Sequence, residues 1–348
     1  MRCWLLALLV LLIPAAQADE LPKIHLKVVG GLGQTVQFKN YEEPFWTRQL
    51  AERFGGRLTA EVSPYDQDGL SGPELLQLAR LGAITIGNVP LAQIVSEDPE
   101  VAGLDLPGLN GDIAALRRSV EAYRSTLADI YRDRYNLELL AVWTNPAQVI
   151  FCTRPISGLA DLRGLKIRVA SAIHADFIAG LGGTGITTPY KEVKAILQQH
   201  VTDCAVTAAI SGYRSGLQEV ASYIHGATIS WGPNILIANR DAWTRLGPDV
   251  QTFLRQQIDE LSAQIWRSVD QESVEGIYCL TGNGPCPSGP TAHLTYVPEG
   301  ASDRDLRRRA LVETVLPRWI DRCGESCAIR WDETIGRLWG LQASVSEP

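Results

Sequence analysis

Beyond Ile13, the sequence has no run of about 20 uncharged apolar residues, the length that an α-helix needs to cross a bilayer. Its Lys and Arg residues are scattered along the chain, and the net charge is -7. Nucleic-acid binding requires a concentrated basic face. We therefore expect a soluble protein, and the sequence argues against a nucleic-acid partner.

Signatures of catalysis are also absent. There is no G-x-S-x-G elbow, because Ser211 before Gly212 lacks the preceding glycine. The turn at residues 30–33 lacks the third glycine of a dinucleotide fingerprint. His174 and His225 could each be a general base, but neither has a nucleophile or carboxylate partner at a telling spacing. The sequence thus predicts no catalytic residues and no cofactor, and a protein that is not an enzyme.

The first eighteen residues predict export. Arg2 provides a positive charge, the run from Trp4 to Ile13 is apolar but short, and Ala16 to Ala18 is a small-x-small cleavage pattern. Residues 1–18 are expected to be a signal peptide, which directs the mature protein to the periplasm. Cys3 lies at the wrong end of the apolar run for a lipoprotein cleavage site.

Six of the seven cysteines follow the predicted cleavage site, an even number in an oxidising compartment. Two pairs lie close together around short turns, and the remaining two cysteines could join two strands of one lobe. A zinc site of Cys and His is the alternative, but the spacings match no standard ligand pattern and the five His residues are dispersed, so we expect no metal. The expected pairs are Cys279 with Cys286, Cys323 with Cys327, and Cys152 with Cys204.

Strand and helix patterns alternate in both halves of the chain. A strand from Lys23 to Gly30 precedes a helical pattern from Phe45 to Phe54, and RLTAEVSPY follows as a second strand. The same order recurs after Leu137. It is the unit of a parallel sheet, and roughly 330 residues exceed what one hydrophobic core supports. The sequence therefore predicts an α/β fold with two lobes.

A long helix is predicted from apolar residues at helical spacing, with Pro248 in its first turn and about seven turns in all. A Gly- and Pro-rich loop is expected from Cys279 to Pro298. Two shorter helices, around residues 306–315 and 335–341, close the chain. The apolar residues of the long helix are Val250, Leu254, Ile258, Leu261 and Ile265.

The chain is also expected to pass between the lobes more than once, because the apolar run SWGPNILIAN could return it to the first lobe. We expect lobe I to comprise residues 19–143 plus about 229–250. Lobe II is expected to comprise residues 144–228 plus about 251–348, which include the C-terminal helices. A hinge of several strands would let the lobes rotate and close on a ligand.

Arg168 is the first candidate for ligand binding. It lies between Ile167 and Val169 in a strand that is predicted to be buried. Its planar fork of donors matches a carboxylate, and an unpaired buried charge is costly. The alternative is an arginine paired with an internal Asp or Glu. Thr207, in a later strand, places a hydroxyl where a larger group would block a ligand.

Other candidates lie where predicted strands and helices end. Gly31 would let a ligand approach a backbone N–H, with Gln34 nearby to bond it, and Asn88 ends the third strand. Tyr190 and Trp231 occupy positions that line crevices outside the carboxyl ends of strands. For each aromatic residue the alternative is packing in the core.

The segment from Asp161 to Ala209 contains DLRGLKIRV, then PYKEV, then VTDCAV. This order resembles the central signature of the DctP-type substrate-binding proteins of tripartite ATP-independent periplasmic (TRAP) transporters. Residues 231–251 and 26–69 are also similar to that family. The resemblance covers most of the mature chain, and it implies a two-lobed periplasmic-binding-protein-like α/β fold with a long helix spanning both lobes.

The resemblance also implies roles for single residues. Arg168 matches the arginine that clamps the ligand carboxylate, and Tyr190 matches an aromatic residue of the pocket. Thr207 stands where many members have an Asn that bonds the ligand. Gln148 lies where many members have a second arginine, which suggests a ligand with one carboxylate. Cys204 replaces a frequent Gly and fits a bond to Cys152.

The function that the resemblance implies is transport. A small organic acid would bind between the lobes of a periplasmic protein, which would deliver it to the small and large membrane subunits of a TRAP permease. One alternative is a binding protein of the same fold that serves a sensor or another uptake system. A periplasmic hydrolase is the other.

Overall fold

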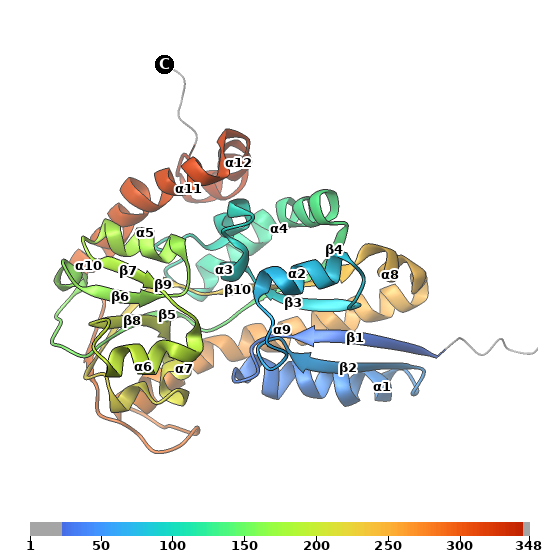
Figure 1. Cartoon of the computed structure of the whole chain (residues 1–348), viewed down its shortest axis with the longest axis horizontal. Helices are drawn as coiled ribbons and strands as arrows, with labels where there is room; N and C mark the ends of the chain where they lie inside the picture. Colours follow the sequence, from blue (N-terminus) through green and yellow to red (C-terminus); the bar gives the residue numbers. More distant parts are fainter. Residues whose placement is uncertain (1–22, 344–348) are drawn as a thin grey trace, which may run out of the picture.

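Two β-sheets divide the structure into two halves (Figure 1). The computed structural model describes residues 23–343. The predicted signal peptide, residues 1–18, lies outside the described residues. Helices pack on both sheets, so the predicted α/β class is confirmed. No helix within residues 23–343 is both long and apolar enough to cross a membrane.

The first sheet has five strands in the order β2-β1-β3-β10-β4. β1 is parallel to β2 and β3, whereas β10 is antiparallel to β3 and β4. In β1, buried Leu26 and Val28 alternate with exposed His25 and Lys27, the period of a strand with one buried face. The strands are β1 Ile24–Gly30, β2 Leu58–Pro64, β3 Ile86–Pro90, β4 Leu137–Thr144 and β10 Pro233–Asn239.

Local sequence explains where the helices around this sheet begin. Ser71 caps α2: the Ser71 N–H donates to the Glu74 carboxylate at 2.8 Å, and the Glu74 N–H donates back to the Ser71 hydroxyl. The helical segments are η1 Gln37–Glu42, η2 Phe45–Gln49, α1 Leu50–Arg53, α2 Gly72–Arg80, α3 Leu91–Ile94, η3 Pro99–Asp105, α4 Ile113–Tyr135 and α8 Arg240–Arg245.

The second sheet has six strands in the order β11-β9-β5-β8-β6-β7. β6 lies between β7 and β8 and is parallel to both, so the carboxyl ends of these three strands meet at one edge. The strands are β5 Gln148–Cys152, β6 Lys166–Val169, β7 Thr184–Thr187, β8 Cys204–Ala208, β9 Tyr223–Ser230 and β11 Thr295–Val297. The helical segments around them are η4 Leu159–Leu162, α5 Ala172–Gly180, η5 Tyr190–Glu192, α6 Val193–Gln198, α7 Ala209–Arg214 and η6 Leu217–Glu219.

Three segments connect the halves. Residues 145–147 join β4 to β5, and residues 231–232 join β9 to β10. The third is α9, Pro248–Thr281, which runs from one half to the other (Figure 1). Trp266 of α9 donates its indole N–H to the Val142 carbonyl of β4 at 3.0 Å. Further along α9, Gly276 packs directly against the backbone of Ile210 in α7.

The C-terminal helices lie against both halves. α10 Ala301–Ala310 continues through η7 Leu311–Val315 into α11 Leu316–Cys323. After a turn at Gly324, the chain forms α12 Glu325–Trp331, η8 Asp332–Gly336 and α13 Arg337–Trp339. Arg318 donates to Asp176 of α5 at 3.1 Å, and Trp319 donates to the Pro99 carbonyl of η3 at 2.6 Å. The lobe boundaries expected from the sequence stay a prediction.

Several details differ from the sequence expectation. α9 has 34 residues and ends at Thr281, so it is longer than the predicted seven turns, and the loop begins at Gly282 instead of Cys279. Gly282 ends the helix in a left-handed conformation with φ +75°. The closing helices are also longer than predicted. α4 was not predicted from the sequence, although its buried residues have helical spacing: Leu116, Val120, Tyr123 and Leu127.

The six cysteines of the described residues form three disulfides with the pairing expected from the sequence. Cys152 and Cys204 lie directly opposite each other on β5 and β8. The other two bonds close the ends of helices: Cys279 belongs to α9, and the bond between Cys323 and Cys327 spans the turn from α11 to α12.

Candidate ligand site between the two sheets

Arg168 is buried in the second sheet with only 3% of its surface exposed. Its Nε and Nη2 donate to the Thr188 carbonyl at 3.2 and 2.5 Å, and its Nη1 donates to the Val206 carbonyl at 3.1 Å. Within the described part of the chain, no acid forms an ion pair with this guanidinium. Burial lowers the pKa of Arg168 to about 10. The alternative of an internal acid partner is therefore not what the structure contains.

The contacts of Arg168 leave part of its guanidinium available. A guanidinium has five N–H donors, and three of them point at the carbonyls of Thr188 and Val206. One N–H remains on each terminal nitrogen. Two donors on neighbouring nitrogens are the arrangement that a carboxylate takes bidentately. Anion binding by these two donors stays a prediction.

Other predicted residues lie towards the same edge of the second sheet as Arg168. Thr207 follows Val206 in β8, and its side chain is buried. Tyr190 lies two residues after Thr188 and is half-buried. Its hydroxyl donates to the Ser211 carbonyl at 2.8 Å. Gln148 begins β5 opposite Ala208, the residue after Thr207. The fold therefore places Arg168, Tyr190, Thr207 and Gln148 towards one edge of the sheet, while their contacts with a ligand stay a prediction.

The predicted residues of the first sheet already have an internal partner. Glu42 of η1 is 1% exposed. It accepts the Gly31 N–H at 3.1 Å and the Asn88 amide at 2.8 Å. The Gly31 N–H that the sequence offers to a ligand, and one amide N–H of Asn88, are thus engaged by a protein carboxylate. The Asn88 Oδ1 is buried and has no hydrogen-bond partner among the described residues.

Two further predicted residues have roles of their own in the fold. Gln34 is exposed, and its side-chain oxygen accepts a hydrogen bond from Lys39 Nζ at 3.1 Å. Trp231 is 3% exposed and donates its indole N–H to the Asn110 carbonyl at 3.0 Å. The Trp231 carbonyl accepts from Gln148 Nε2 at 3.3 Å, so both residues hold the connection between the sheets.

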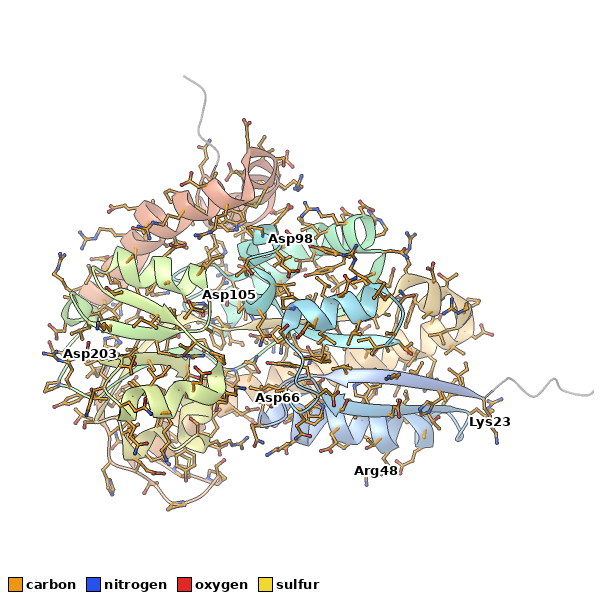
Figure 2. All side chains as sticks on the ribbon, in the orientation of Figure 1. Lys23, Arg48, Asp66, Asp98, Asp105 and Asp203 are labelled. Atoms are coloured by element: carbon orange, nitrogen blue, oxygen red, sulfur yellow. A yellow bond between two sulfur atoms is a disulfide. The ribbon has the colours of Figure 1, made fainter. Side chains whose placement is uncertain are left out.

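A pocket lies beside the Arg168 cluster, between the two halves. Leu91 and Asp105 line it from the first half, Ser171 and His174 from the start of α5, and Gly232 from the connecting segment. None of the predicted ligand residues lines this pocket. Ser171, which lines it, follows Arg168 by three residues, where β6 passes into α5. Figure 2 shows Asp105 in the region where the two halves meet.

His174 is the centre of a buried hydrogen-bonded chain. Its Nδ1 lies 2.7 Å from the Ser171 hydroxyl, and its Nε2 lies 2.7 Å from the Ser230 hydroxyl. Burial, and then the charge of Arg168, lower the pKa of His174 to about 4. The imidazole is therefore neutral at neutral pH, with one nitrogen donating and one accepting. Within residues 23–343 no carboxylate bonds to this ring, and no cluster of His, Cys, Asp and Glu could hold a metal.

The buried carboxyl of Glu42 should make the stability of the protein depend on pH. Burial raises the pKa of Glu42 from 4.5 to about 7. Between these pH values the folded state binds more protons than the unfolded state, so the free energy of unfolding falls as the pH rises. Glu42→Gln has no carboxyl to ionise, so it does not lose stability between these pH values. If the Asn88 side-chain amide rotates by half a turn, its Oδ1, which has no partner in wild type, accepts from the new glutamine amide. We expect the variant to be more stable than wild type by about 2 kcal/mol at pH 8, and equal to it near pH 4.5.

Urea unfolding at both pH values measures this difference. The titration of His174 is common to both proteins, so it cancels in the comparison. Glu43→Gln is the matched control, because Glu43 is the exposed neighbour in the same segment. Equal stability of Glu42→Gln and wild type at pH 8 would show that the carboxyl is not destabilised by its burial.

The sequence reading did not identify Glu42, Asp105 or the serines around His174. The sequence around Asp105 could have indicated a buried acid, because Asp105 lies between Leu104 and Leu106 in an apolar run. Both leucines are fully buried in the structure. No sequence pattern indicated that Glu42 is buried, because two consecutive glutamates are typical of the exposed face of a helix. Ser230 meets His174 across 56 residues of sequence, a separation that no local pattern reveals.

Two α/β halves joined by short connections and one long helix, with an unpaired cation at a sheet edge, define a solute-binding protein. The chain belongs to the DctP family, family 7 of the bacterial extracellular solute-binding proteins, whose sequence profile matches residues 34–278. The resemblance noted from the sequence is therefore confirmed. This family consists of receptors for solutes and not of enzymes.

Individual relatives agree with this family. The C4-dicarboxylate-binding periplasmic protein DctP of Rhodobacter capsulatus is 26% identical over 218 residues, which cover 61% of this chain and 64% of that protein. A TRAP periplasmic solute-binding protein of Desulfovibrio salexigens, solved with orotic acid, has a TM-score of 0.77 at 19% identity and covers 91% of this chain and 100% of its own. A Bordetella pertussis extracytoplasmic solute receptor that binds pyroglutamic acid has a TM-score of 0.76 at 19% identity, with 89% and 98% covered. These structures confirm the predicted two-lobed fold.

Proposed function

We propose that this chain is the periplasmic receptor of a TRAP transporter, and that it binds a small organic acid through Arg168. The observation that carries the proposal is the buried guanidinium, which has no acid partner in the described chain and has one free N–H on each terminal nitrogen. A charge buried in this way is costly unless an anion pairs with it. A ligand carboxylate supplies that anion.

The ligand is proposed to carry one carboxylate. The resemblance noted from the sequence implies a second arginine in many members at the position of Gln148. The Gln148 amide donates to the Pro146 and Trp231 carbonyls at 3.2 and 3.3 Å. Gln148 therefore supplies neither a charge nor a free donor on Nε2 for a second carboxylate. Orotate and pyroglutamate, the ligands of two proteins with this fold, are compact ring acids with a single carboxylate. Such acids suit one arginine with Tyr190 beside it.

Capture is proposed to be coupled to closure of the two halves. The connections at residues 145–147 and 231–232 are short, and α9 contacts both halves. A ligand that contacts both halves favours the closed state by its differential affinity for that state. The closed receptor then delivers the acid to the small and large membrane subunits of the permease. The export signal that the sequence predicts for residues 1–18 agrees with this periplasmic role.

A thermal-shift screen against organic acids tests the proposal. A ligand that binds only the folded state stabilises it by RT ln(1 + [L]/Kd), about 2.7 kcal/mol at one hundred times Kd, which raises Tm by about 5 °C for a chain of this size. We expect such a shift with a monocarboxylate such as pyroglutamate or orotate, and a smaller one with succinate.

Two outcomes contradict the proposal. If no acid in the panel raises Tm, the carboxylate assignment fails. If a stabilising acid, or an ester of it, is consumed on incubation, the hydrolase alternative gains support, since His174 lies within 2.7 Å of two serine hydroxyls. Uptake of the stabilising acid by vesicles that contain the permease separates a transport receptor from a sensor.

A further inference from the structure

The connection between β9 and β10 is fixed by the carboxylate of Asp105. The backbone N–H groups of Trp231 and Gly232 both donate to Asp105 Oδ2, at 2.7 and 3.3 Å. The carbonyl of Gly232 accepts two bonds from Asn145, which lies in the other short connection. Gly232 has φ +90°, a conformation that suits glycine alone. Asp105 is thus the anchor that ties this connection to η3.

Asp105 is itself held by a buried chain of hydrogen bonds. Its Oδ1 accepts from the amide of Asn110 at 2.9 Å. The Asn110 Oδ1 accepts from the Ser119 hydroxyl at 2.7 Å, and the Ser119 hydroxyl accepts from the indole N–H of Trp339 at 3.0 Å. Asn110 and Ser119 are 1% and 0% exposed. The chain therefore links α13, near the end of the described residues, to the connection between the sheets.

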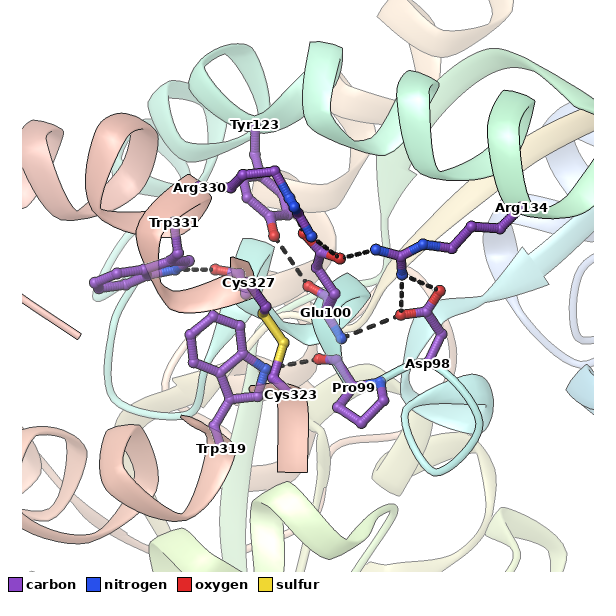
Figure 3. The surroundings of a disulfide bond; sticks show 11 residues. Asp98, Pro99, Glu100, Tyr123, Arg134, Trp319, Cys323, Cys327, Arg330 and Trp331 are labelled. Atoms are coloured by element: carbon purple, nitrogen blue, oxygen red, sulfur yellow. Dashed lines mark hydrogen bonds and ion pairs between the residues drawn. A yellow bond between two sulfur atoms is a disulfide. The ribbon is translucent and has the colours of Figure 1, made fainter. Parts of the chain in front are cut away.

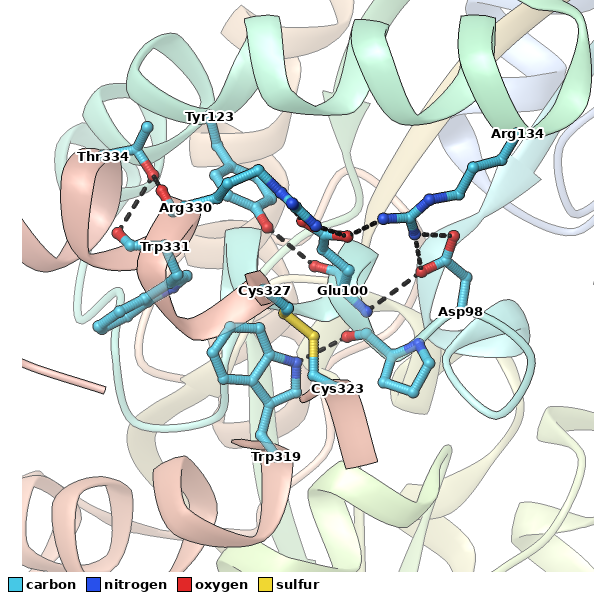
Figure 4. Close-up of polar contacts among 11 residues, drawn as sticks. Asp98, Glu100, Tyr123, Arg134, Trp319, Cys323, Cys327, Arg330, Trp331 and Thr334 are labelled. Atoms are coloured by element: carbon cyan, nitrogen blue, oxygen red, sulfur yellow. Dashed lines mark hydrogen bonds and ion pairs between the residues drawn. A yellow bond between two sulfur atoms is a disulfide. The ribbon is translucent and has the colours of Figure 1, made fainter. Parts of the chain in front are cut away.

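The segment that carries Asp105 is also clamped at its other end. Figures 3 and 4 show Glu100 of η3 between two guanidinium groups, with the disulfide of Cys323 and Cys327 beside it. Arg330 donates to both oxygens of Glu100, at 2.6 and 2.8 Å, and Arg134 pairs with the same carboxylate. Trp331 donates its indole N–H to the Gly103 carbonyl at 2.9 Å. η3 is consequently fixed against the C-terminal helices before the chain reaches Asp105.

We propose that Asp105 is a positioning residue for ligand binding: it holds the connection at Trp231 and Gly232 in the geometry that shapes the pocket next to Arg168. The proposal rests on the proposed function for its effect on affinity. Gly232 and Asp105 line the same pocket as Ser171 and His174. Short connecting segments absorb the backbone changes of a hinge motion. Ordering a loose connection costs affinity when the ligand binds, and a connection held by Asp105 is already ordered.

A reciprocal exchange of side chains tests this role. In Asp105→Asn, the side-chain oxygen can still accept the Trp231 N–H. The new amide group then faces the Asn110 amide, so two donors oppose each other. In Asn110→Asp, two carboxylates face each other across the 2.9 Å contact. The double variant restores a donor facing an acceptor between positions 105 and 110, because the amide now at position 105 can donate to the carboxylate now at position 110 and still accept from the connection. It does not restore the bond from the Asn110 amide to the Leu104 carbonyl, 3.2 Å in wild type. It also restores the net charge of the pair.

Hydrogen exchange of the amides of Trp231 and Gly232 is the first readout. We expect about tenfold faster exchange in each single variant, and a rate within about threefold of wild type in the double variant. Ser119→Ala, a milder change one step further along the chain, should give a smaller increase. Asp112→Asn is the matched control, because Asp112 caps α4 by accepting the Ala115 N–H and asparagine caps a helix equally well. Unchanged exchange in the single variants, or a double variant no slower than the singles, overturns the proposal.

Affinity for pyroglutamate, measured by calorimetry, is the second readout. We expect a roughly tenfold weaker Kd in each single variant and recovery in the double variant. Faster exchange with an unchanged Kd would overturn the positioning role, because the connection would then be loose without effect on binding. If wild type does not bind pyroglutamate, that ligand assignment fails, and the exchange rates alone decide whether Asp105 holds the connection.

Discussion

Arg168→Met is expected to weaken binding of the organic acid by about 100-fold. Two charge-assisted hydrogen bonds between a guanidinium and a carboxylate contribute on the order of 3 kcal/mol together, and each 1.4 kcal/mol is a factor of ten in Kd. Methionine fills similar space without donors or charge. The carbonyls of Thr188 and Val206 lose their partner, but the uncompensated buried charge is also removed. The change in affinity should therefore exceed the change in stability.

Calorimetric titration with the acid identified by thermal shift measures this effect, alongside urea unfolding of each variant. Lys166→Met is the matched control, because it removes an exposed cation from the same strand. Arg168→Lys should lie between wild type and Arg168→Met, since an ammonium keeps the charge and loses the planar fork. If Arg168→Met binds as tightly as wild type, the carboxylate lies elsewhere.

The sequence predicted the strands and helices whose side chains alternate clearly. In β1 and β6 the apolar residues repeat with the period of a strand, and Arg168 was predicted to be buried because its neighbours in that strand are apolar. β7 was missed because it is an edge strand of four residues, with Thr184 and Thr187 exposed. Such a strand exists because β6 is beside it, and its own composition does not show it.

The candidate site was predictable only where one residue carries the signal. Arg168 is a buried cation in a single strand, so local pattern and residue type sufficed. Glu42 meets Asn88 across 46 residues, and Asp105 meets Trp231 across 126. Contacts of this kind depend on how the sheets place strand ends, so the internal partners of Gly31 and Asn88 could not be read from their neighbours in sequence.

The second large effect is expected from the disulfide between Cys152 and Cys204. The bond closes a loop with a sequence separation of 52, which limits the conformations of the unfolded chain. In the chain-entropy description, removing it costs about 4 kcal/mol of unfolding free energy. The bond between Cys323 and Cys327 closes a separation of only 4, and the same description gives about 2 kcal/mol. The paired changes Cys152→Ala/Cys204→Ala and Cys323→Ala/Cys327→Ala therefore form a matched comparison.

Urea unfolding without reductant measures both pairs, and alkylation before unfolding should detect no free thiol in wild type. Equal losses for the two pairs would contradict the dependence on loop length. The longer loop also contains Arg168, Ser171, His174 and Tyr190, the residues around the proposed carboxylate site. Because Cys152 and Cys204 join β5 to β8 at the ends of these strands away from Gln148 and Thr207, the loss should fall mainly on stability. We expect Kd for the acid to change by less than about threefold at temperatures where the variant remains folded, since the remaining ladder still holds β8 beside β6.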